Sequence, residues 1–272
     1  MATDNNSYFS NAFPGQVEAF RGNIYSLDGT PKYSLGFRIS RQDGNIYRYG
    51  QFGAATNRGL LVSQDLSETS IPDTDNGMVA PASALVTSDG TIGAHFIEIT
   101  MSGVIKNQFQ GGYLATTDDV GEGYTYRIKG NTASGYNGAT AYRLELYDPL
   151  QVAIDNTTDY TIIGCMFNDL EAATLGTDSA VIGASCATTT SAKPFAFVQT
   201  RGVCGVLQDA SSVLPAVGDM VQLSALTAGA VGAYVGGSVG TTTALLARAL
   251  VVGYCLDIGD STGATTVFLQ LE

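Results

Sequence analysis

Hydrophobic and polar residues alternate in several short stretches of the chain. Between Tyr33 and Ile39 the odd positions are apolar and the even positions are small or polar. The same alternation recurs over residues 96–101, 124–128 and 142–147. A period of two places successive side chains on opposite faces of a strand, so each stretch predicts a half-buried β-strand.

Turn signals separate these stretches, because Asp-Gly and Asn-Gly pairs supply the positive φ angles of tight hairpins. They occur at Asp28-Gly29, Asp43-Gly44, Asn76-Gly77, Asp89-Gly90 and Asn137-Gly138. Helix signals are confined to residues 81–86 and 241–250, and the β-branched residues at the start of the second favour a strand. Short strands with frequent turns predict an all-β protein built as a sandwich or barrel.

The composition changes near residues 148–160. The chain is rich in Tyr and Arg before this point and in Ala, Val, Gly and Thr after it. We therefore predict an N-terminal β-sandwich or β-barrel domain over residues 21–150 and a small C-terminal β-barrel domain over residues 151–272. Residues 1–20 carry aromatic residues but too few apolar ones for a core of their own, which predicts an extended arm that packs on something else.

The chain has 272 residues and a net charge of −12, and this charge is unevenly spread. Residues 1–60 hold six basic and four acidic residues, which leaves 7 basic and 21 acidic residues for positions 61–272. A C-terminal body with a net charge of −14 repels phosphates, so we expect no nucleic-acid partner. The basic N-terminal region is either a solvated strand face or a surface that docks on an acidic partner.

The candidate partner-binding residues combine the aromatic side chains of the arm with the arginines of the basic region. Aromatic and arginine side chains contribute most of the binding energy at protein interfaces. The candidates are Tyr8, Phe9, Phe13, Phe20, Arg21, Arg38, Arg41, Arg48 and Arg58.

Membrane and secretion signals are not found in the sequence. No stretch approaches the ~18 consecutive apolar residues of a transmembrane helix, so we expect no membrane partner. Residues 1–7 lack the basic and apolar regions of a secretory signal, which predicts synthesis in the cytoplasm.

The cysteines and carboxylates offer few metal ligands at suitable spacing. The four cysteines form no C-x-x-C pair and lie in apolar runs, so we expect free, buried thiols. The segment Asp73–Gly77 resembles the start of an EF-hand loop, but its glycine comes one position early. Three carboxylates at Asp118, Asp119 and Glu122 are either a Ca²⁺-binding loop or a solvated turn, and we favour the turn. We expect no bound metal or cofactor.

Catalytic patterns are weak or incomplete. The segment Gly236–Gly240 matches G-x-S-x-G, but His95, the only histidine, precedes Ser238, so the order of a Ser-Asp-His triad fails. We expect His95 to be a hydrogen-bonded structural residue on a strand. Phosphate-binding glycine loops are absent from the sequence. The protein is therefore predicted not to be an enzyme.

The C-terminal half has a recognisable order of segments. It runs from Ile162–Cys165 to Pro194–Leu207, which contains FAFVQTRGVCGVL, then to Pro215–Val221, Val251–Cys255 and Thr265–Leu271. This order resembles tailed-bacteriophage capsid decoration (cement) proteins, which show an aromatic-V-Q-T-x-G segment, a v-G-D-x-v turn, a v-G-y strand and a terminal v-x-L. The resemblance covers about 110 residues.

The resemblance implies a structural virion protein that is made in the host cytoplasm and binds the outer surface of the major capsid protein lattice. It also implies a homo-oligomer, either a dimer or a trimer, and a small β-barrel without catalytic residues. One alternative is a carbohydrate- or receptor-binding β module of a phage head fibre or tail accessory protein, with Tyr47 or Tyr49 stacking on sugars. Another is a glycoside hydrolase that uses paired carboxylates.

Overall fold

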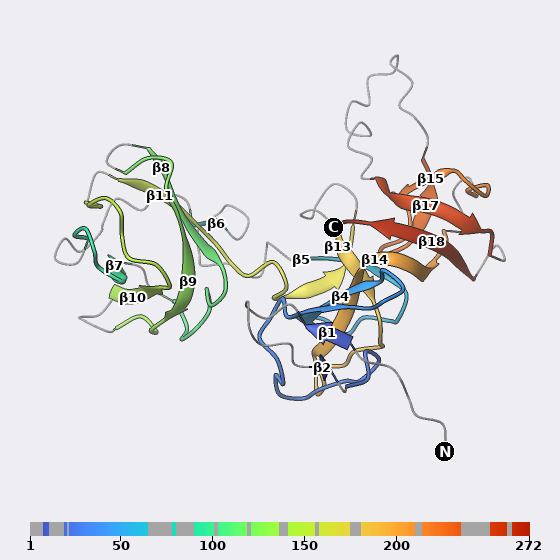
Figure 1. The fold of residues 1–272 in the computed structure, drawn as a ribbon, viewed down its shortest axis with the longest axis horizontal. Helices are drawn as coiled ribbons and strands as arrows, with labels where there is room; N and C mark the ends of the chain where they lie inside the picture. Colours follow the sequence, from blue (N-terminus) through green and yellow to red (C-terminus); the bar gives the residue numbers. More distant parts are fainter. Residues whose placement is uncertain are drawn as a thin grey trace, which may run out of the picture. The chain divides into compact units, whose positions relative to one another are not determined.

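The fold is that of a computed structural model. It describes residues 8–10, 19–20, 22–64, 78–79, 90–100, 103–118, 121–135, 141–155, 158–174, 181–209, 214–234, 251–259 and 263–272. Every regular element in these ranges is a β-strand, which confirms the predicted all-β class. The strands form two antiparallel sheets (Figure 1). The described part contains no helix long and apolar enough to cross a membrane.

The chain divides into two compact units. Residues 1–65 and 167–272 form the large unit, and residues 66–166 form the small unit. This division differs from the expected boundary at residue 150, because strands from both ends of the chain share one sheet. Strand β4 (Ile46–Gln51) pairs with β14 (Phe195–Leu207). Composition cannot reveal a pairing between segments so far apart in the sequence.

The sheet of the large unit is built around β14. Its main path runs through nine strands, in the order β16 (Val231–Ala233), β15 (Met220–Leu223), β17 (Val251–Asp257), β18 (Ala264–Gln270), β14, β4, β3 (Arg38–Ser40), β1 (Tyr8–Ser10) and β2 (Ala19–Phe20). Three strands branch from this path, namely β5 (Leu61–Gln64), β12 (Leu170–Ala172) and β13 (Val181–Ser185). The predicted arm therefore supplies two short strands at one edge of this sheet.

The small unit is a six-stranded antiparallel sheet that curls into a half-barrel (Figure 1). Its order is β6 (Met78–Val79), β11 (Asp159–Ile163), β8 (Tyr113–Asp118), β9 (Thr125–Asn131), β10 (Ala141–Leu146) and β7 (Phe96–Thr100). The concave side encloses one core, to which Ile97, Leu114, Ile128, Leu144 and Ile162 each contribute from a different strand. The first segment of the decoration-protein resemblance, Ile162–Cys165, therefore lies in the small unit, whereas the other segments lie in the large unit.

An aromatic cluster supports the strands β3, β4 and β14. Phe197 and Tyr49 are directly opposite each other on β14 and β4, with their rings 5.0 Å apart. The predicted strand over residues 33–39 is wrong for most of its length, because β3 begins only at Arg38 and Gly36 has a φ of +78°. The apolar residues of that stretch pack on the same cluster from a turn, with the rings of Tyr33 and Phe37 stacked at 4.8 Å. The other three alternating stretches form β7, β9 and β10 as predicted.

A bulge in β14 changes which residues face outward. The register with β4 shifts between Gln199 and Arg201, and Gly202 has a φ of +96°. Before the bulge every residue of β14 is buried, whereas Arg201 and Val203 after it are exposed. A Cβ atom at Gly202 would lie 1.8 Å from the Oδ1 atom of Asn45. The glycine therefore lets the turn of the β3–β4 hairpin approach β14.

We predict that Gly202→Ala lowers the free energy of unfolding by about 2 kcal/mol, through backbone strain and the clash with Asn45. The matched control is Gly44→Ala, because Gly44 also has a positive φ (+84°) but has open space where a Cβ would stand. We expect the control to lose about 1 kcal/mol. Urea denaturation followed by circular dichroism measures both, and equal losses would contradict a steric role for Gly202.

Candidate functional site

Three arginines converge at a surface hollow of about 340 Å³ in the large unit. The hollow lies where the β3–β4 hairpin meets β14 and β18, and we call it the basic hollow. Its lining residues are Arg38, Ser40, Arg41, Asp43, Gly44, Ile46, Arg201 and Phe268. Two of the three arginines, Arg38 and Arg41, are among the sequence candidates. The third, Arg201, lies on β14 and is distant from the other two in the sequence.

The hairpin turn beside the basic hollow is tied to β14 by side-chain hydrogen bonds. The Asp43 carboxylate accepts hydrogen bonds from the backbone N–H and the side-chain Nδ2 of Asn45, at 3.0 and 2.9 Å. The Oδ1 atom of Asn45 in turn accepts a hydrogen bond from the backbone N–H of Val203 at 3.1 Å. The Arg41 guanidinium lies 5.2 Å from the centre of the Tyr47 ring, a cation–π distance. These contacts fix the turn and orient Arg41.

A carboxylate at the end of the chain balances one lining arginine, Arg38, and one neighbouring arginine, Arg48. Arg38 and Arg48 are directly opposite on β3 and β4, an arrangement in which like charges repel. Glu272 accepts a hydrogen bond from Nε of Arg48 at 2.8 Å, and its carboxylate lies 3.8 Å from Nε of Arg38. The Thr200 hydroxyl donates to the same carboxylate at 3.0 Å. Glu272 therefore neutralises part of the positive charge beside the hollow.

Two other sequence candidates, Arg48 and Arg58, do not line the basic hollow. Arg48 donates from Nη1 to the carbonyl of Gly36 at 3.0 Å and lies over the Phe167 ring. Arg48 thus adjoins the hollow through Glu272 and through Arg38 on the neighbouring strand, but does not line it. Arg58 is exposed and does not line the hollow; its backbone N–H donates to the Thr188 hydroxyl at 3.2 Å.

The aromatic candidates of the arm are only partly covered by the structure. Tyr8, Phe9 and Phe20 lie in β1 and β2, and their side chains fall outside the description. Phe13 and Arg21 lie outside the described residues.

Removing the Glu272 charge is predicted to strengthen anion binding at the basic hollow. We expect Glu272→Gln to tighten the binding of a hexa-aspartate peptide by about 2–5-fold at low ionic strength, because one neutralising carboxylate is lost. Calorimetric titration measures this, and added salt should reduce the gain. The same substitution at exposed Glu122 in the small unit should change nothing. Equal gains in both variants would show a general charge effect.

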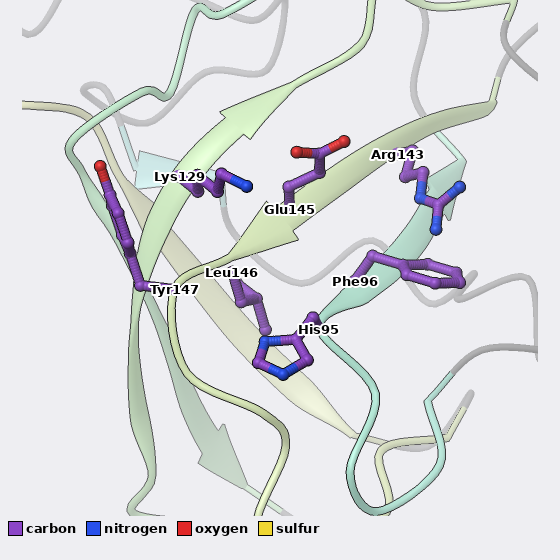
Figure 2. A pocket seen from close by; sticks show the side chains of 7 residues that line it. All are labelled: His95, Phe96, Lys129, Arg143, Glu145, Leu146 and Tyr147. Carbon is purple, nitrogen blue, oxygen red and sulfur yellow. The ribbon is translucent and has the colours of Figure 1, made fainter.

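A second hollow, of about 420 Å³, lies on the outer face of the small unit and is called the mixed hollow (Figure 2). It is lined by His95, Phe96, Lys129, Arg143, Glu145, Leu146 and Tyr147. The register explains this gathering, because Glu145 on β10 is directly opposite Phe96 on β7 and Gly130 on β9. The hollow therefore combines cations, one carboxylate and aromatic rings.

Some side chains of the mixed hollow are held against aromatic rings, and others are exposed to solvent. The Arg143 guanidinium lies over the Phe96 ring, and the Arg127 guanidinium lies 5.2 Å from the centre of the Tyr147 ring. The Tyr147 side chain is 51% exposed, which leaves much of the ring accessible. His95 lies just before β7 and is exposed. The expectation of a hydrogen-bonded structural histidine is not met, since no described residue hydrogen-bonds to its ring.

The cysteines are free thiols in largely apolar surroundings. Cys165, Cys186 and Cys255 are buried, as expected, and Cys204 is half-buried. Burial raises the pKa of the Cys204 thiol to about 12 and raises the pKa of Cys186 further still. Both thiols are therefore protonated and weakly nucleophilic near neutral pH.

The remaining sequence candidates provide no assembled chemical site. Tyr47 and Tyr49 are buried in the aromatic cluster, which contradicts their expected role in stacking on sugars. Within the described ranges, no three His, Cys, Asp or Glu side chains come together as a metal site. Glu122 is exposed in a turn. Asp119 and the segments 73–77 and 236–240 lie outside the described residues.

The comparisons with known proteins identify no relative. The chain matches no protein-family model, no curated protein and no solved structure.

Proposed function

We propose that this chain is a non-enzymatic structural virion protein that binds the outer surface of an assembled major capsid lattice and stabilises the head. The convergence of Arg38, Arg41 and Arg201 on one sheet face carries this proposal. Guanidinium groups form charge-assisted, bidentate hydrogen bonds with carboxylates, so such a cluster suits an acidic protein surface. The sequence resemblance to capsid decoration proteins supplies the class of partner.

The way the arginines are held also supports a docking role. Arg41 lies against Tyr47, and the hairpin turn is bonded to β14 through Asn45. Side chains that are ordered before binding lose less conformational entropy when a partner arrives. The basic hollow is thus preorganised for a fixed surface such as a capsid lattice.

Co-sedimentation with capsids of the virus that encodes the chain tests this function. We expect the natural chain to bind at a fixed ratio to the capsid subunits, and Arg38→Glu with Arg41→Glu to weaken binding at least about 100-fold. The control is Arg58→Glu, which reverses the charge of one arginine outside the hollow. An equal loss in the control, or no binding by the natural chain, would overturn the proposal.

A second candidate function is that of a carbohydrate- or receptor-binding module, and the mixed hollow favours it. An exposed Tyr147 ring beside the Glu145 carboxylate and the Lys129 ammonium offers a stacking surface together with hydrogen-bonding groups. A glycan array would test it, with binding expected to be lost in Tyr147→Ala. Binding should be retained in Tyr113→Ala, since Tyr113 is similarly exposed on β8 but does not line the hollow. A silent array would refute this function.

A further inference from the structure

Four apolar residues form a row across the outer face of the large unit. In the strand register, Val203 on β14 is directly opposite Phe268 on β18, Phe268 is opposite Tyr254 on β17, and Tyr254 is opposite Met220 on β15. Val203, Tyr254 and Met220 are 52%, 43% and 41% exposed, and Phe268 is half-buried. We call these residues the apolar row.

This row lies on the face of the sheet that is turned away from the core. The residues next to the row along their strands, Cys255, Val267 and Leu269, are fully buried in the core, so the row points to the opposite side. Solvated faces of antiparallel sheets are normally polar. A contiguous apolar patch that crosses four strands therefore indicates an interaction surface.

Two charged residues flank the apolar row on opposite sides of Phe268. Arg201 on β14 is opposite Gln270, which is two residues after Phe268 on β18. Asp257 on β17 is opposite Thr266, which is two residues before Phe268. Both charged residues are exposed, and neither makes an ion pair with any described residue. Phe268 thus lies on the diagonal line that runs from the Arg201 cation to the Asp257 anion.

We propose that this face binds a second copy of the chain in a symmetric dimer. The two-fold axis of this dimer lies in the plane of contact and passes through Phe268. It is perpendicular to the line from Arg201 to Asp257, and it places the two Phe268 rings against each other. The same rotation brings Arg201 of each copy next to Asp257 of the other. The surface is therefore self-complementary, as an isologous interface requires. The strands of the two copies would cross steeply, close to the orthogonal class of sheet packing.

The dimer goes beyond the proposed function, since one copy alone has a complete basic hollow. Arg201 and Phe268 form the side of that hollow toward β18, and Arg38 and Arg41 form the side toward β3. In the dimer Arg201 and Phe268 are engaged in pairing, so Arg38 and Arg41 are the lining residues of the basic hollow that remain for the capsid. The dimer is therefore tested on the full chain without capsids, so that its result is independent of capsid binding.

Sedimentation velocity over a concentration series measures the association. We expect the natural chain to be a dimer, and either Asp257→Arg or Arg201→Asp to raise the dissociation constant at least about 100-fold, since each reversal replaces two attractions with two repulsions. The variant that carries both reversals should dimerise again, because each new arginine then faces a new aspartate. Arg38→Glu with Arg41→Glu should leave the dimer intact.

Each outcome decides the proposal. Recovery of the dimer in the double reversal supports it, and circular dichroism of each single variant shows whether that variant is folded. A natural chain that is monomeric throughout, or that forms a trimer, would overturn it. The proposal also fails if the double reversal stays monomeric while its circular dichroism spectrum matches that of the natural chain.

Discussion

Replacing Phe197 with alanine is expected to lower the free energy of unfolding of the large unit by about 3–5 kcal/mol. Phe197 is fully buried, and its ring lies 5.0 Å from the Tyr49 ring and 5.9 Å from the Tyr33 ring. Removal of the ring leaves a cavity between β14, β4 and the turn before β3. Native-state hydrogen exchange with mass spectrometry measures the loss peptide by peptide.

The Phe197 prediction has a conservative control. Phe197→Leu keeps most of the apolar volume and should lose less than about 1.5 kcal/mol. Because the same cluster supports the strands that carry Arg38 and Arg201, the proposed function predicts that the alanine variant also binds capsids more weakly as temperature rises. An alanine variant as stable as the leucine variant would show that the cluster can collapse around the missing ring.

Strand positions were predictable where apolar and polar residues alternate because one face of the sheet is buried and the other is exposed. The stretches at 96–101, 124–128 and 142–147 form β7, β9 and β10, because their apolar residues face the core of the half-barrel. The stretch at 33–39 shows the same pattern but contains Gly36 in a left-handed conformation. Its apolar residues reach the core from a turn, which periodicity alone cannot distinguish from a strand.

The candidate site was only partly predictable, because it depends on long-range pairing. Arg38 and Arg41 were identified by the charge of the N-terminal region. Arg201 was not, because its place beside them follows from the pairing of β14 with β4. Tyr47 and Tyr49 were expected at the surface, yet they lie in the core, since a tyrosine in a strand suits either face. The mixed hollow had no sequence signal, because its residues meet only across three strands.

The division into two units has a consequence for folding. The small unit is one continuous segment with its own core, whereas the large unit is formed by the two segments on either side of it. Compact units with separate cores are able to open independently. A core substitution in the small unit should therefore leave the large unit and its basic hollow unaffected.

Leu144→Ala tests this independence, with an expected loss of about 3–5 kcal/mol in the small unit alone. Leu144 is fully buried in β10, directly opposite Ile97 on β7 and Asn131 on β9. Hydrogen exchange should accelerate in β7, β9 and β10 while peptides from β14 and β18 keep their protection. Leu144→Met should lose less than about 1.5 kcal/mol. Equal acceleration in β14 would mean that the two units unfold as one, because only a shared cooperative transition transmits the loss to a strand of the other unit.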